Sequence, residues 1–149
     1  MKMKRVLWTA AFLSSLSCVS IAAADLPEEY KMVISARIEP YYTVNIPADK
    51  EIAYGALRTD IGSVILKDAL LEIDHVVRVE ALCDGNLDNG EQKLPYMLCA
   101  GEERFLTADF EKEGEAVPLT VKIEEADWNR AAAGSYADTV TFRVSYVEK

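Results

Sequence analysis

The stretch that decides the fold is "AGSYADTVTFRVSYVEK", residues 133–149. From Val140 to Tyr146 its apolar residues alternate with polar ones. A period of two is typical of a β-strand with one buried face. We expect residues 139–147 to insert into a sheet of their own chain, with Phe142 and Val144 buried. The domain would then be a self-complete monomer.

The same kind of run recurs along the chain, separated by turn residues rich in Gly, Pro, Asn and Asp. We interpret residues 25–31 as a polar lead-in and residues 63–71 as either a strand or a helical turn. Regularly spaced short strands predict an all-β, immunoglobulin-like antiparallel sandwich of two sheets, with about eight or nine strands. The expected strands cover residues 32–40, 41–47, 51–57, 63–71, 75–83, 94–100, 104–110, 116–124 and 139–147.

One stretch, "EEADWNRAAAG" (residues 124–134), is compatible with a helix. We expect a helical turn near residues 126–132, ended by Gly134 as a C-cap. Trp128 would then pack into the core at one end of the sandwich. No second composition block or repeat follows, so residues 25–149 are predicted to form a single domain.

The first 24 residues have the features of a secretory signal peptide. Lys2, Lys4 and Arg5 precede an apolar stretch that ends in small residues before Asp25. The mature protein is therefore expected outside the cytoplasm: secreted, at the cell surface, or in the periplasm of a Gram-negative cell. Lipidation at Cys18 is an alternative, although Ser15 stands where a lipobox has Leu. No later stretch is apolar enough to span a membrane.

The mature chain is strongly acidic. Its 13 basic and 25 acidic residues leave a formal charge of −12. Such a charge repels the phosphates of nucleic acids and the surface of anionic lipid, so we expect neither as a partner.

Two cysteines remain after residue 24, and an even number in an exported chain suggests a disulfide. Cys83 and Cys99 bracket a turn that carries Asn89-Gly90, a strong hairpin signal. We predict that the two cysteines face each other on one hairpin and form a disulfide. Two free, buried thiols are the alternative.

The chain has little material for catalysis. His75 is the only histidine, and we expect neither a His-based catalytic triad nor a zinc site with several histidines. We expect it to begin a strand at the surface. The carboxylates are scattered among lysines and arginines, so we predict no enzyme activity and no cofactor.

Two binding sites remain as alternatives. A turn with oxygen ligands at alternate positions suggests calcium; it consists of Asp84, Asn86, Asp88 and Glu91. This turn fails the EF-hand pattern, because Asn89 and Pro95 stand where Gly and Glu belong. An exposed ring from Tyr41 or Tyr42 could contact carbohydrate.

Two stretches carry a resemblance to a known group. "LPYML" (residues 94–98) and "AAGSYADTVTFRVSY" (residues 132–146) resemble the closing half of the spore coat protein U and fimbrial-subunit-like β-sandwiches. That group has a turn Gly-x-Tyr-x-Asp-Thr before its last strand, and the matching positions here are Gly134, Tyr136, Asp138 and Thr139.

The resemblance implies an exported immunoglobulin-like sandwich of pili, coats or surface layers, with no catalytic residue. The first half departs from the group, since Tyr42-Thr43-Val44 stands where an early cysteine is expected. We therefore expect a structural or adhesive protein that binds other surface subunits or itself. The alternative is a small carbohydrate- or calcium-binding module. The lead-in at residues 25–31, with Pro27, is too short to donate a strand.

Overall fold

The computed structural model describes residues 29–149, so the predicted signal peptide and Cys18 lie outside the described residues. The chain divides after Ala36 into two units. Residues 29–36 are the described part of the first unit, and they form neither helix nor strand. Every helix and strand described between residues 29 and 149 belongs to the second unit, Arg37–Lys149.

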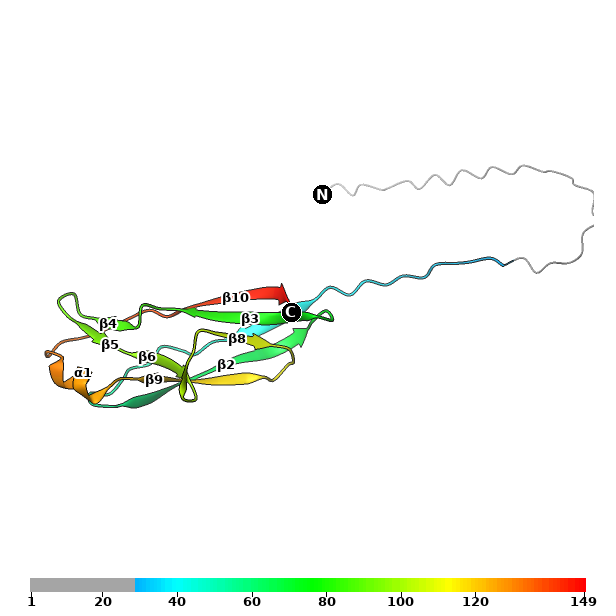
Figure 1. The fold of residues 1–149 in the computed structure, drawn as a ribbon. Helices are drawn as coiled ribbons and strands as arrows, with labels where there is room; N and C mark the ends of the chain where they lie inside the picture. The colour runs from blue at the N-terminus through cyan, green and yellow to red at the C-terminus, as the bar shows by residue number, and fades with distance from the viewer. Residues whose placement is uncertain (1–28) are drawn as a thin grey trace, which may run out of the picture. The chain divides into compact units, whose positions relative to one another are not determined.

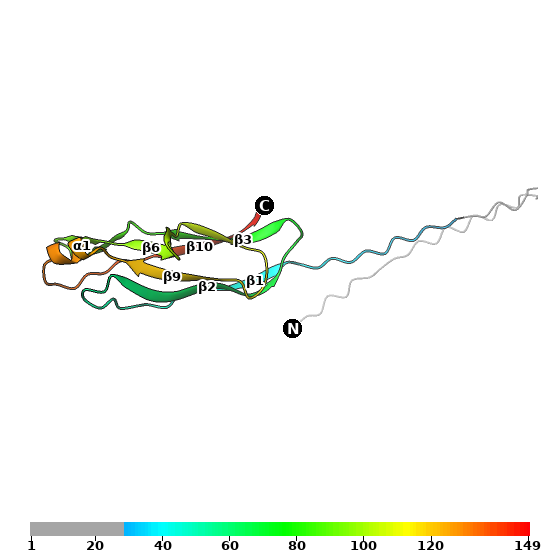
Figure 2. The ribbon, with the colours of Figure 1, turned by 60° about the horizontal axis from the view of Figure 1, so that its bottom comes forward.

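The second unit is an antiparallel β-sandwich with two main sheets, which confirms the predicted all-β class (Figures 1 and 2). The first sheet has the order β1 (Tyr41–Asn45), β2 (Arg58–Leu70), β9 (Ala116–Lys122), β6 (Met97–Ala100) and β7 (Glu103–Arg104). The second sheet has the order β10 (Thr141–Glu148), β3 (His75–Leu82) and β8 (Thr107–Phe110). A separate hairpin pairs β4 (Asn86–Asp88) with β5 (Lys93–Pro95).

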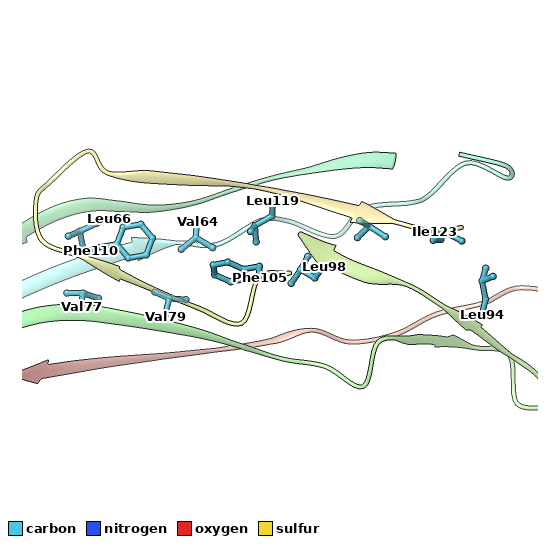
Figure 3. Close-up of a cluster of buried hydrophobic side chains, with 11 residues drawn as sticks. Val64, Leu66, Val77, Val79, Leu94, Leu98, Phe105, Phe110, Leu119 and Ile123 are labelled. Atoms are coloured by element: carbon cyan, nitrogen blue, oxygen red, sulfur yellow. The ribbon is translucent and has the colours of Figure 1, made fainter. Parts of the chain in front are cut away.

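The core fills the space between the two main sheets. Figure 3 shows Val77 and Val79 of β3 pointing toward Val64 and Leu66 of β2. Phe110, which ends β8, packs in the same cluster and is almost completely buried. Inward-facing residues alternate with outward-facing ones along these strands, as the period of two requires.

The Asn89-Gly90 turn forms a hairpin, as predicted, but it joins different strands. It connects β4 and β5, where Leu87 pairs with Leu94. Gly90 has a φ of 89°, a conformation that favours glycine. Its N–H donates a hydrogen bond to Asp88 Oδ1 (2.6 Å), which closes the turn.

The predicted helix is also present, as α1 (Glu125–Arg130), at one end of the sandwich (Figures 1 and 2). Trp128 packs against the core, and its Nε1–H donates to the carbonyl of Ala56 at 3.0 Å. The predicted C-cap at Gly134 is wrong, because Ala131 is already extended and caps the helix.

Two of the predicted strands are wrong. Residues 32–40 form no strand, and the first strand begins at Tyr41. Their alternation is real, but no described strand pairs with them. Residues 51–57 form a turn in which Gly55 has a φ of 76°. Residues 63–70 do form a strand, as the second part of β2.

The core position of Leu119 yields a stability prediction. Leu119 is fully buried, whereas Leu106 is 58% exposed. We expect Leu119→Ala to lower the free energy of unfolding by about 2–5 kcal/mol, because it removes buried methyl groups and leaves a cavity. Leu106→Ala should cost less than about 0.5 kcal/mol. Urea denaturation followed by circular dichroism measures both, and equal losses would contradict the assigned core.

Candidate functional site

The last strand has one open edge. β10 pairs with β3 along its whole length, from Thr141 opposite Leu82 to Glu148 opposite His75. This confirms that the strand inserts into a sheet of its own chain. Within residues 29–149 no strand pairs with the other edge of β10 (Figure 1). An edge of this kind presents unpaired backbone donors and acceptors.

The ladder identifies the residues that face the open edge. Residues directly opposite each other alternate between hydrogen-bonded and non-hydrogen-bonded pairs. The N–H of Lys149 donates to the carbonyl of Asp74 at 2.9 Å, which continues the β10–β3 register. Odd-numbered residues of β10 therefore turn their backbone groups toward β3. Phe142, Val144 and Tyr146 turn theirs toward the open edge.

The inward side chains of β10 are less well covered than those of β3. Val77 and Val79 are completely buried. Phe142, Val144 and Tyr146 pack against the same core but are only half-buried. The prediction that Phe142 and Val144 are buried is therefore wrong. The physical reason is that no strand from residues 29–149 covers the core beside β10.

Two adjoining hollows lie at the end of the sandwich where β10 begins. The smaller, of about 280 Å³, is lined by Phe142, Val140, Ile61 and Val121 among others. The larger, of about 830 Å³, is lined by Trp128 and by residues 131–138. Five residues line both hollows: Asp49, Lys50, Ile52, Leu87 and Asp138. Apolar side chains of the core are thus accessible from this side.

The other rim of the open side is β1 and the segment that follows it. The rings of Tyr42 and Tyr146 stack with their centroids 5.9 Å apart, near the end of β10. Residues 47–50, which follow β1, line the smaller hollow with Val140 and Phe142 near the start of β10. β1 therefore runs in the opposite direction to β10 along the open side.

The segment before β1 is apolar and exposed. On one face of an extended chain Met32, Ile34, Ala36 and Ile38 would lie together. Met32 is 80% exposed, Ile34 82% and Ile38 74%. Their alternation predicts an ordinary first strand. The sequence shows this alternation, but only the fold shows that no strand of residues 29–149 pairs with them.

The predicted disulfide is not formed, and both cysteines are free. Cys99 lies in β6 of the first sheet, and Cys83 follows β3 of the second. The prediction was wrong because the chain between them forms its own β4–β5 hairpin and then crosses to the other sheet. Cys99 is buried and Cys83 is half-buried.

The predicted calcium turn uses its carboxylates on its own backbone. Asp84 Oδ1 accepts from the N–H of Asn86 at 2.9 Å, and Asp88 Oδ1 accepts from Gly90. Lys93 also forms an ion pair with Asp84 at 3.4 Å. Among residues 29–149 no three His, Cys, Asp or Glu side chains, those of Glu91 and Asp84 included, gather as a metal site.

The two tyrosines at the start of β1 have different environments. Tyr41 is 58% exposed, whereas Tyr42 is 38% exposed and stacks on Tyr146. His75, which begins β3 as predicted, stacks on the same Tyr146 ring at 4.9 Å. These stacked rings strengthen one end of the sandwich, and Tyr41 takes no part in the stacks.

The turn before β10 lies beside the two hollows. The hydroxyl of Tyr136 donates to the carbonyl of Ala132 at 3.0 Å. Asp138 Oδ1 accepts from the N–H of Thr139 at 2.7 Å, as expected for a residue that begins a strand. A side chain at Gly134 would meet Asn89 Nδ2 at 3.0 Å, which explains the small residue there.

A hydrogen bond between half-buried Tyr96 and exposed Asp138 connects this turn to the β4–β5 region. The hydroxyl of Tyr96 donates to Asp138 Oδ2 at 2.6 Å. Burial, the hydrogen bond to Asp138 and a further one with Cys83 raise the pKa of Tyr96 far above its usual range. The phenol therefore stays protonated in the folded protein and holds Asp138 beside the hollows.

Comparison of the chain with protein-family models, with curated proteins and with solved structures finds no match. None of the helices described between residues 29 and 149 has the length and apolar character needed to cross a bilayer.

The free cysteines give a second testable prediction. In the native protein a maleimide should modify Cys83, which is half-buried, and should leave the buried Cys99 unmodified. Denaturation without a reductant should make Cys99 reactive as well. Mass spectrometry of the labelled peptides locates each modification. A peptide pair joined by a Cys83–Cys99 disulfide would contradict the structure.

Tyr96 gives a prediction about pH. Its folded-state pKa is raised, so its contribution to stability is complete below the unfolded value of about 10 and declines as the pH rises above it. We expect the free energy of unfolding to fall more between about pH 9 and pH 11 in the wild type than in Tyr96→Phe. Denaturation at several pH values measures this difference. Parallel curves for the two proteins would show that Tyr96 ionises normally.

Proposed function

We propose that this chain is an exported structural subunit that binds other proteins through a β-strand added at the open edge of β10. The observation that carries this proposal is the half-buried state of Phe142, Val144 and Tyr146 beside an unpaired backbone edge. Strand addition supplies backbone hydrogen bonds, while pockets for alternate side chains give specificity. The open side of the sandwich has backbone groups that face away from β3 and hollows beside β10 that are lined by apolar side chains.

The strand order supports the same proposal. An immunoglobulin-type sandwich has strands A, B, E and D in one sheet and C, F and G in the other. In chain order β1, β2, β3, β6, β9 and β10 take the positions of A to F. β8 is added beside the strand at position C. The position of G, next to β10, has no strand from residues 29–149.

The features of residues 1–24 and the resemblance of residues 132–146 to fimbrial-subunit-like proteins are consistent with this role. Both favour a protein that acts outside the cytoplasm and assembles with other subunits. An acidic body also keeps the chain soluble before it binds a partner. The proposed role is therefore structural or adhesive, at a cell surface or in a secreted assembly.

A substitution in β10 beside the open edge, made in the cells that carry the gene, tests this role. We expect the wild-type protein in assemblies much larger than one chain, as judged by size separation of native extracts. Val144→Asp should release it as a single chain, because a charge among the half-buried side chains of β10 opposes the addition of an apolar strand. Thr141→Asp is the matched control, since Thr141 is an exposed residue of the same strand.

The thermal unfolding of both purified variants by circular dichroism shows whether the sandwich is intact. Wild-type protein that migrates only as a single chain would contradict the proposed function. So would assemblies that persist in a folded Val144→Asp variant.

A further inference from the structure

We propose that the strand added at β10 is the segment 30–38 of a second copy of this chain, and that it runs antiparallel to β10. This inference rests on the proposed function, and it identifies the partner. Its basis is the agreement of the segment with the open edge in side-chain phase, in length and in charge.

The apolar side chains of the segment alternate in step with those of β10. Residues directly opposite each other in an antiparallel pair point to the same face. Ile34 opposite Val144 places Met32 opposite Tyr146 and Ile38 opposite Val140. The apolar face of the segment then covers the half-buried face of β10, and the small Ala36 lies opposite the large ring of Phe142.

The same register also matches the backbone hydrogen-bonding groups of the segment to those at the open edge of β10. Val144 directs its N–H and C=O toward the open edge, as do its neighbours two residues away on β10. Ile34 opposite Val144 would therefore form a hydrogen-bonded pair. Nine residues of extended chain, from residue 30 to residue 38, span about 30 Å, which is slightly more than the eight residues of β10.

The chain is poorly placed to fill its own edge in this direction. Ile38 opposite Val140 would lie six residues along β10 from Tyr146, or about 20 Å. Tyr42 is fixed beside Tyr146 by their stacked rings. The four residues from Ile38 to Tyr42 can span at most about 14 Å. A strand of the same chain in this direction would need a fully extended link and a chain reversal within these four residues, so a strand from another molecule fits the edge better.

The charges are complementary. Residues 30–38 carry Lys31 and Arg37 and no acidic residue, whereas residues 41–149 have 11 basic and 21 acidic residues. In the proposed register Arg37 lies opposite Thr141 and Lys31 opposite Val147, so both lie on the outward face of the sheet and not among the carboxylates of the hollows. The complementarity is therefore one of net charge. A positive segment on a body with a charge of −10 favours association over repulsion.

Substitutions in the exposed segment test whether it is the occupant. The purified chain with its extension should form dimers and larger oligomers in size-exclusion chromatography with light scattering. Ile34→Asp should abolish them, because it places a charge against the half-buried apolar face of β10. Val33→Asp should leave them unchanged, since Val33 lies on the opposite face and is 90% exposed. Equal effects of the two substitutions would overturn the inference.

Cross-linking between copies tests the direction. Purified I38C is mixed with purified V140C and oxidised, and the products are mapped by mass spectrometry. The antiparallel register brings these two positions together, at the Cα separation of about 5.5 Å that a disulfide accepts. We expect a linked dimer of one I38C and one V140C chain. A mixture of I38C with E148C, which a parallel strand would bring together, should give none.

The outcomes separate the two proposals. A link to E148C in place of V140C would overturn the proposed direction. The purified chain could stay monomeric while the native cell forms assemblies that Val144→Asp abolishes. This result would overturn the second copy as the partner and leave the proposed function intact. Absence of both kinds of assembly would overturn both.

Discussion

A β-strand in a sandwich needs hydrogen-bond partners along both edges or exposure of one edge to water, and its inward side chains need a cover. β10 has β3 along one edge and no described strand along the other. The consequence is local, since Val77 and Val79 on the adjacent strand are completely buried while Phe142 and Val144 are not. The remaining features of the open side follow from this one vacancy.

Contacts at both ends of the open side hold the sandwich together around the open edge of β10. The stacked rings of Tyr42, Tyr146 and His75 hold β1 and β10 together at one end of the open side. At the other end the Tyr96–Asp138 hydrogen bond and the packing of Trp128 support the walls of the hollows. Between them, the fully packed residues of β2, β3, β8 and β9 carry the stability of the sandwich (Figure 3). The fold therefore stays intact although no strand from residues 29–149 occupies the position beside β10.

Much of the fold could be predicted from local patterns. Alternation located the strands that contain His75 and Phe142, and the Asn89-Gly90 dipeptide located a hairpin. Partners across the sandwich could not be predicted in this way, because a period of two says that a strand has a buried face but not which strand covers it. The error at residues 32–40 has this origin, as does the Cys83–Cys99 disulfide. The same limit hid the site, which consists of a missing pair and has no motif of its own.

The central claim is that the backbone of β10 is open in the single chain and paired in the assembly. Amide hydrogen exchange tests it directly on the purified protein with its extension, at a dilution where it is monomeric and at a concentration where it assembles. The account predicts that the amides of Phe142, Val144 and Tyr146 exchange fast in the monomer and slowly in the assembly. The amides of Arg143 and Ser145, which face β3, should be protected in both. Slow exchange of Val144 in the monomer, or no change on assembly, would contradict it.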